Sequence, residues 1–408
     1  AFCVGDKKEL PHISATAPLI LRESEAYLAE LTTYTCIENC VWGWHMEEKK
    51  KRKIRILQFA VAAELVLCLI ALAGIWTGRK NAEQQDWMVE AVSDGYIKWV
   101  DFDVSYTALC EAYRTDVESY EQDVHFDWVE LLAYLGTRYG GEFDSHEKSI
   151  KKDIAKVTEK LTAEKGLTMK ELMKDNEYYS YYEEAYRTVL GGMVGEFERE
   201  VRAEDGSSIW EKVYGLKAYS PIAKGFEYSH YDDFGAGRSY GYKRQHLGHD
   251  MMGQVGTPII AVESGYVEAI GWNQYGGWRI GIRSFDKKRY YYYAHLRQNY
   301  PYAEDLKEGS AVTAGDVIGY MGHTGYSTTE NTNNIKVTHL HWGMELVFDE
   351  SQKESDHEIW INVYPLTMFL SRHQSEAAKV EGTKEWKRVS DIRDPAVTLY
   401  LQKEKISQ

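Results

Sequence analysis

The chain has 408 residues, a length that suits two folded units with further segments, because single domains run to about 100–150 residues. Its hydrophobic fraction of 44% and aromatic fraction of 13% are sufficient for buried cores, so the composition excludes global disorder. The formal net charge of −15 argues against binding to nucleic acid, whose phosphates require clustered lysine and arginine.

An apolar stretch near the N-terminus, residues 56–76, predicts a transmembrane helix. It reads ILQFAVAAELVLCLIALAGIW and matches the ~20 residues that a helix needs to cross the hydrocarbon core. Glu64 inside it is either tolerated or marks a helix partner in the membrane. Basic residues crowd into 49–55 just before the span, which predicts a cytoplasmic segment 1–55 and an extracytoplasmic remainder. We therefore expect a single-pass membrane protein.

Residues 84–202 show apolar positions three and four apart, which predicts an all-helical extracytoplasmic domain. Tyrosines are concentrated near its end. Tyr179 and Tyr181 lie off the apolar stripe and are candidates for binding glycan, although the cluster could instead contact protein. The other members share one helical face, which favours core packing: Tyr178, Tyr182, Ala185, Tyr186 and Val189.

The helical period breaks at residues 205–208 and again at Pro221, so we expect a linker over 203–231. Residues 232–372 then show short strand-like runs bounded by glycine, aspartate or lysine, which predict a mostly antiparallel β domain. Residues 373–408 are expected to form a C-terminal tail. The predicted fold class is α+β and multidomain, with one N-terminal transmembrane helix, an all-helical middle domain and a mostly antiparallel β domain.

Three histidine clusters lie in the predicted β domain. In a strand, residues two apart project from the same face, so His339 and His341 should point into one site. Leu340, Trp342 and Met344 should then face the core. The three clusters are His246-Leu-Gly-His249-Asp250, Tyr293-Ala294-His295-Leu296 and His339-Leu340-His341-Trp342.

These residue types are suited to a catalytic zinc site, which uses three protein ligands and keeps one position for water. His246, Asp250 and either His339 or His341 would satisfy that requirement. Zinc lowers the pKa of its water towards ~7 and polarises a substrate carbonyl. The remaining imidazoles could accept the proton of the water and donate to the oxyanion. The spacing alone does not choose between the paired histidines.

The order and spacing of several motifs resemble the lysostaphin and LytM type of zinc peptidoglycan endopeptidase, over residues 232–372. The motifs are RSYGYKRQHLGHD, GTPIIAVESGYV, YYYYAHL, VTAGDVIGYMGHTGYST and HLHW. The resemblance implies one zinc ion held by His246, Asp250 and His341. It further implies that His339 is the general base, and that His295 assists it and stabilises the oxyanion. The reaction implied is hydrolysis of a peptide bond in the wall's stem peptides or cross-bridges.

The sequence departs from the family pattern in three places. The segment TENTNNIKVT, residues 329–338, is longer than usual and should lie beside the active-site groove. His249 and His323 are extra histidines that we interpret as non-ligands, and Gly343 shifts the sequence that usually follows the histidine pair.

Two other functions are considered beside that of a membrane-anchored wall hydrolase. A non-catalytic relative could use the same fold to bind the wall or to dock on another protein. The enzyme could also belong to a secretion, conjugation or sporulation assembly in the envelope, with the helical segment 84–202 as its docking element.

Overall fold

The computed structural model describes residues 97, 100–203, 205–240, 242–353, 355 and 357–407, which belong to one compact unit. The predicted cytoplasmic segment 1–55 and transmembrane helix 56–76 lie outside the described residues. Within the part that is described, no helix is both long enough and apolar enough to span a membrane.

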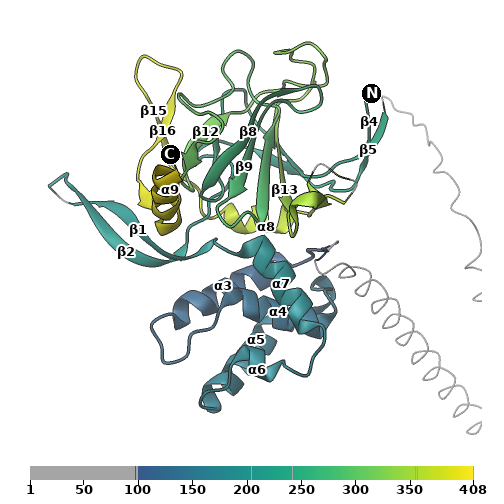
Figure 1. Ribbon diagram of the computed structural model, residues 1–408, viewed down its shortest axis with the longest axis vertical. Coiled ribbons are helices and arrows are strands. Elements are labelled where there is room, and N and C mark those ends of the chain that lie inside the picture. The colour runs from purple at the N-terminus through teal and green to yellow at the C-terminus, as the bar shows by residue number, and fades with distance from the viewer. Residues whose placement is uncertain are drawn as a thin grey trace, which may run out of the picture. The chain divides into compact units, whose positions relative to one another are not determined.

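Helices make up the first part of the described chain (Figure 1). Three of them begin at side-chain caps: Ser105 accepts a hydrogen bond from the Ala108 amide, Asp127 from the Val129 amide, and Thr168 from the Glu171 amide. Gly140 ends the second of them in the left-handed conformation, with φ of 64°. The helices are α3 (Tyr106–Ser119), α4 (Trp128–Tyr139), α5 (Ile150–Ala163), α6 (Met169–Leu172) and α7 (Tyr179–Leu190), with a 3-10 turn, η1, at Asp144–His146.

The helical region ends earlier than the sequence predicted, because β1 (Val194–Arg202) is a strand. It pairs along its whole length with β2 (Ser208–Leu216), and β17 (Ile392–Arg393) pairs on its other side. A strand forms here because burial alternates between neighbouring residues: Phe197 is buried, whereas the charged residues on either side of it are not. The residues 205–208, expected to open a linker, instead form the turn and strand start of a hairpin.

The larger sheet confirms the predicted mostly antiparallel β architecture. Its strand order is β11-β8-β9-β10-β13-β6-β3, with β14 paired to β13, and its pairs are antiparallel. The strands are β3 (Ser229–Tyr231), β6 (His249–Met252), β8 (Gly265–Asn273), β9 (Gly277–Ser284), β10 (Arg289–Ala294), β11 (Ala311–Val312), β13 (His339–Leu346) and β14 (Ile359–Trp360).

Smaller elements surround this sheet. The predicted linker 203–231 contains β2 and β3, and the predicted tail 373–408 contains strands and a helix, so both segments differ from the sequence interpretation. The remaining elements are the hairpin β4 (Gly237–Tyr240) and β5 (Tyr242–Gln245), the pair β7 (Pro258–Ile260) and β12 (Val317–Tyr320), the pair β15 (Ala377–Lys379) and β16 (Trp386–Arg388), the 3-10 turn η2 (Glu350–Gln352), and the helices α8 (Tyr364–Leu370) and α9 (Pro395–Ser407).

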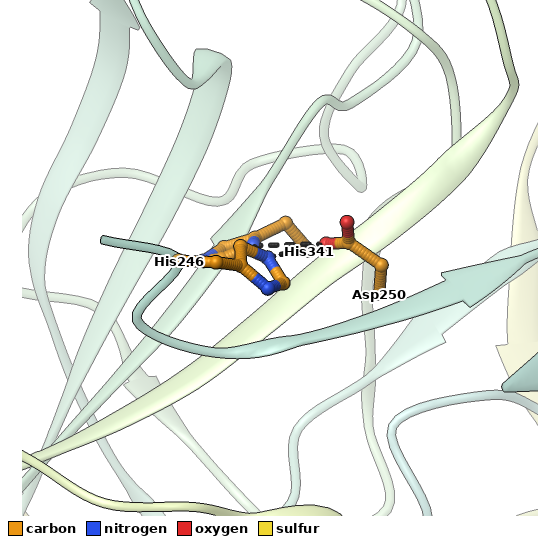
Figure 2. A group of neighbouring side chains, drawn as sticks. All are labelled: His246, Asp250 and His341. Atoms are coloured by element: carbon orange, nitrogen blue, oxygen red, sulfur yellow. Dashed lines mark hydrogen bonds and ion pairs between the residues drawn. The ribbon is translucent and has the colours of Figure 1, made fainter. Parts of the chain in front are cut away.

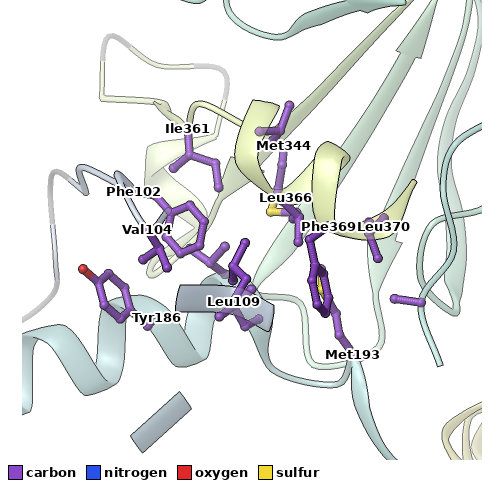
Figure 3. Packing of buried hydrophobic residues seen from close by; sticks show 14 of the residues in the cluster. Phe102, Val104, Leu109, Tyr186, Met193, Met344, Ile361, Leu366, Phe369 and Leu370 are labelled. Atoms are coloured by element: carbon purple, nitrogen blue, oxygen red, sulfur yellow. The ribbon is translucent and has the colours of Figure 1, made fainter. Parts of the chain in front are cut away.

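One hydrophobic core joins the helices to the sheet. Leu340, Trp342 and Met344 are fully buried on one face of β13, as the alternation along this strand predicted. Figure 3 shows Met344 near residues of α8, with side chains of the helical part packed in the same cluster, among them Phe102 and Leu109. The helical segment and the β segment therefore do not have separate cores.

The two tyrosines singled out as glycan-binding candidates are in this core. Tyr179 is 7% exposed and Tyr181 is 8% exposed, so neither offers a surface platform. Tyr182 and Tyr186 are buried too, as expected of the apolar stripe. The prediction for Tyr179 and Tyr181 is wrong because α7 is covered on more than one side, which a single stripe in the sequence does not reveal.

Candidate metal centre

Three side chains from the predicted ligand set converge at one point (Figure 2). His246 Nε2 lies 3.0 Å from Asp250 Oδ1 and 2.9 Å from His341 Nδ1. His341 Nδ1 lies 3.0 Å from the same carboxylate oxygen, which closes a triangle of ligand atoms. Among the described residues this is the group whose ligand atoms gather closely enough to hold a metal ion.

The backbone explains why these residues meet. Asp250 on β6 pairs directly with His341 on β13, so the two side chains leave the sheet side by side. His246 directly follows β5, and the turn at Gly248 leads from it into β6, so its side chain lies close to Asp250 and His341. An added Cβ at Gly248 would lie 2.6 Å from the His341 ring, so a side chain there would push on the imidazole. The glycine lets the turn approach the ring closely.

The triangle is of the size that zinc requires. Zinc binds histidine nitrogen and carboxylate oxygen at about 2.0–2.2 Å, which puts tetrahedral ligand atoms roughly 3.3 Å apart. The separations here are 2.9–3.0 Å, so the ligands would move by only a few tenths of an ångström. Two imidazoles and one carboxylate are also a donor set that zinc accepts.

A second set of charged residues holds the ligands, and the sequence interpretation missed it. Asp233 Oδ1 lies 2.8 Å from His246 Nδ1, close enough for an ion pair although not aligned as a good hydrogen bond. Arg238 forms an ion pair with Asp233 and places Nη2 3.3 Å from Asp250 Oδ2. Such outer partners fix the orientation of metal ligands. Arg238 opens the motif RSYGYKRQHLGHD and Asp233 precedes it, but neither residue has a spacing that assigns it this role, so only the folded chain reveals it.

Electrostatics in this site keep Asp250 ionised and His341 neutral. Burial alone would raise the pKa of Asp250, but hydrogen bonds with His246 and His341 lower that pKa well below its usual range. Burial also lowers the pKa of His341, only partly offset by the Asp250 carboxylate. A carboxylate and a neutral imidazole are the protonation states that bind a metal cation.

The two remaining predicted site residues, His295 and His339, face the same place. Their ring centroids lie 4.7 Å apart, and the His295 ring lies 6.0 Å from that of His341. The Nδ1 of His339 lies 2.8 Å from the Val337 carbonyl oxygen. The Nδ1 of His295 lies 3.0 Å from a carbonyl oxygen as well, that of Thr324. Each carbonyl favours the tautomer with the proton on Nδ1, which leaves Nε2 able to accept a proton.

His295 is held in an uncommon backbone conformation. Its φ is 62°, in the left-handed region that non-glycine residues rarely occupy. The residue is 6% exposed, and burial, followed by the nearby imidazoles, lowers its pKa well below the usual value. Local strain of this kind is concentrated at functional sites. The structure therefore supplies a neutral, fixed imidazole beside His339.

These residues line one side of a groove of approximately 920 Å³. Ile335, Lys336 and Val337 line it too, so the segment 329–338 does lie beside the groove as the sequence predicted. Arg244 adds a cation at the same wall, 5.0 Å from the centroid of the Tyr326 ring.

The two extra histidines lie outside the ligand triangle. His249 Nε2 lies 2.8 Å from His230 Nδ1, and the two rings are stacked. Burial, with a smaller contribution from His230, lowers the pKa of His249 to about 3. His323 Nδ1 lies 2.9 Å from the Ile335 carbonyl oxygen. Neither residue belongs to the group formed by His246, Asp250 and His341.

Comparison with known proteins places this centre in a family. Residues 244–354 match peptidase family M23. The chain carries an M23 peptidase domain in its C-terminal region. The matched segment contains all five predicted site residues, since it begins before His246 and ends after His341. The family resemblance noted in the sequence is thus confirmed.

Individual relatives cover the same domain. The chain is 34% identical over 166 residues to the L-Ala–D-Glu endopeptidase of Bacillus subtilis, which is 41% of this chain and 47% of that protein. It is 32% identical over 143 residues to the glycyl-glycine endopeptidase ALE-1 of Staphylococcus capitis, 35% of this chain and 34% of the relative. The chain thus spans about half or less of these relatives. The solved catalytic domain of lysostaphin from Staphylococcus simulans is 29% identical, with a TM-score of 0.27, covering 35% of this chain and 92% of that domain.

Proposed function

We propose that the chain is a zinc endopeptidase that hydrolyses peptide bonds in peptidoglycan stem peptides or cross-bridges. One observation carries the proposal: His246, Asp250 and His341 form a zinc-sized triangle beside two further imidazoles, His339 and His295, in an open groove. A purely structural metal site is closed, whereas a catalytic one has three protein ligands and an accessible position.

The residues would divide the reaction as follows. A zinc ion held by these three ligands would lower the pKa of a bound water and would polarise the carbonyl of the bond to be cut. His339, with Nδ1 held by the Val337 carbonyl, accepts a proton at Nε2 as the general base. His295 would assist when the proton that His339 took from the water passes to it: its Nε2–H then donates to the developing oxyanion, and the same proton finally goes to the leaving amine. The Thr324 carbonyl keeps that ring in place.

The substrate class is supported by the relatives. Two similar proteins carry the names L-Ala–D-Glu endopeptidase and glycyl-glycine endopeptidase, which refer to different peptide bonds. We therefore propose peptidoglycan peptides in general as the substrate. The acidic chain gives no electrostatic attraction to an anionic wall, so specific contacts in the groove must provide binding.

The location proposed for this activity is the outer side of a bacterial cell membrane. It rests on the apolar residues 56–76 and the basic residues 49–55 before them, which favour one helix with a cytoplasmic N-terminus. Tethering would confine the peptidase domain to the wall layer next to the membrane.

The test uses the full chain purified in detergent. We would measure bound zinc and analyse the fragments released from several types of peptidoglycan. Asp250→Ala should lose the metal, because it removes the one carboxylate ligand, whose Oδ1 lies 3.0 Å from the ligand nitrogens of both His246 and His341. His339→Ala should keep most of the zinc and lose turnover by about 10²–10⁴-fold. A fully active His339→Ala variant would show that the general base has been assigned to the wrong residue.

The second candidate function is a non-catalytic module that binds the wall or docks in an envelope assembly. The intact ligand set and the accessible groove favour catalysis over it. Zinc retention by the wild-type chain together with no cleavage of any peptidoglycan would favour the docking module instead.

A further inference from the structure

Glu345 lies on the same face of β13 as two of the site histidines. Residues two apart along a strand share a face, so His339, His341 and Glu345 all point into the groove. Glu345 is four residues beyond His341, which corresponds to about 13 Å along the strand. It therefore lies at a distance from the metal centre that an extended peptide of roughly four residues would span.

The side chain of Glu345 is buried and lacks a partner. It is 2% exposed, and its Oε1 has no hydrogen-bond partner within the described part of the chain. The nearby cations are engaged elsewhere: Lys353 Nζ lies 2.6 Å from Glu268 Oε2, and Arg283 Nη2 lies 2.7 Å from Glu350 Oε1. A buried carboxyl group in this situation costs free energy unless something pairs with it.

The surroundings of Glu345 favour a positive ligand over a negative one. Burial and then the Glu358 carboxylate raise the pKa of Glu345 to about 8, although Lys353 and Arg283 oppose this shift. Glu268 and Glu358 line the same end of the groove. The chain's own Lys353 shows that this end accommodates an ammonium, because its Nζ contacts Glu268 and lies 4.7 Å from the centroid of the Tyr290 ring.

Between the metal centre and Glu345, aromatic rings form the floor of the groove. Tyr292 on β10 pairs with Gly343 on one side and Gly281 on the other. A Cβ added at Gly343 would lie 2.9 Å from the Trp360 ring, and one added at Gly281 would overlap Tyr290. The two glycines thus make room for flat rings over which an extended substrate can lie. The departure of Gly343 from the family pattern has a physical role in this floor.

We propose that Glu345 forms a subsite for a primary ammonium group of the peptide substrate, about three or four residues from the bond that is cut. The proposal rests on the endopeptidase function given above and narrows its substrate to peptides that carry a free amine. The ammonium donates to Glu345, whose carboxyl group releases its proton to solvent as the ammonium binds, and the Trp360 and Tyr290 rings flank it. In peptidoglycan such a group would be the side-chain amine of a diamino acid.

The experiment compares lysine-containing peptidoglycan before and after acetylation of its amines. At limiting substrate, the zinc-loaded full chain should release fragments from the native wall about tenfold faster than from the acetylated wall. Glu345→Gln should lower the rate on the native wall by about tenfold, leave the acetylated wall unaffected, and so abolish the preference. Glu376→Gln is the matched control, because Glu376 lies on the surface in an exposed ion pair with Lys224.

A binding assay separates this inference from the catalytic proposal. The zinc-free chain is mixed with native or acetylated wall, and the fraction that sediments with each wall is measured. Wild type should bind the native wall more tightly than the acetylated wall, and Glu345→Gln should bind both equally. If no wall is cleaved but this preference holds, the subsite stands and the peptidase function fails. If wild type shows no preference for the free amine, or Glu345→Gln keeps the preference, the subsite is refuted. A thermal unfolding midpoint near that of wild type would show that the variant folds normally.

Discussion

Replacing Gly248 with alanine tests whether the turn before β6 is built around the metal ligands. The added Cβ would meet His341 Nε2 and Cε1 at 2.6 Å and the Trp342 carbonyl oxygen at 2.9 Å. Ordinary van der Waals contact needs about 3.4 Å, so the ring or the turn must move by roughly 0.8 Å. Metal coordination tolerates only about 0.2 Å. We therefore expect Gly248→Ala to weaken zinc binding by about 10–100-fold, the size of effect seen when ligand orientation is lost.

Zinc affinity would be measured by competition with a chelator of known affinity, together with the thermal unfolding midpoint of the zinc-free chain. Gly237→Ala is the control, because a Cβ there meets nothing within 4 Å and the residue lies in the neighbouring hairpin. Overpacking at Gly248 should also destabilise the zinc-free chain by about 1–3 kcal/mol. Wild-type zinc affinity in Gly248→Ala, with the fold intact, would refute the view that this turn positions His341.

Other parts of the structure give three further predictions. Asp233→Asn removes the charge beside His246 Nδ1 and should weaken zinc binding about tenfold, whereas Asp232→Asn in the same competition assay should not. Because the pKa of His249 is about 3 when folded and near 6.5 when unfolded, the zinc-free chain should lose stability as pH falls below about 6.5. His249→Gln should remove up to about 1.4 kcal/mol per pH unit of this slope, and an unchanged slope in denaturant titrations would contradict the assignment. Arg289→Met should cost about 3–5 kcal/mol of unfolding free energy, because it leaves the Glu263 charge buried without its cationic partner, and adding Glu263→Gln should recover much of that loss.

Strand alternation made much of the proposed metal centre predictable from the sequence. A period of two places His339 and His341 on one face and Trp342 on the other, whatever the rest of the fold does. The choice of His341 as a ligand came from the resemblance. In the structure His341 pairs directly with Asp250, while His339 Nε2 is 3.7 Å from that carboxylate.

The features that the sequence did not predict depend on contacts between distant segments. Asp233 and Arg238 support the ligands only because a hairpin folds back over them. Glu345 looks like an ordinary strand residue, and its burial comes from neighbouring strands and from the segment after β13. The same limit explains Tyr181, whose side chain lies off the apolar stripe of α7 yet is covered by the surrounding core. Local periodicity reports the face of an element, not how many neighbours cover it.

The helical segment contributes to the groove through a buried charge network on β10. Arg289 at the start of this strand donates from Nη1 to the Thr188 carbonyl oxygen of α7 at 2.7 Å and from Nε to Glu263 at 2.8 Å. Tyr291 donates to the same carboxylate at 2.6 Å. The intervening side chains of β10, Tyr290 and Tyr292, belong to the groove floor, and the strand ends one residue before His295. Because α7 fixes one end of this strand and His295, the proposed catalytic imidazole, follows the other, the helices are part of the framework that positions the site.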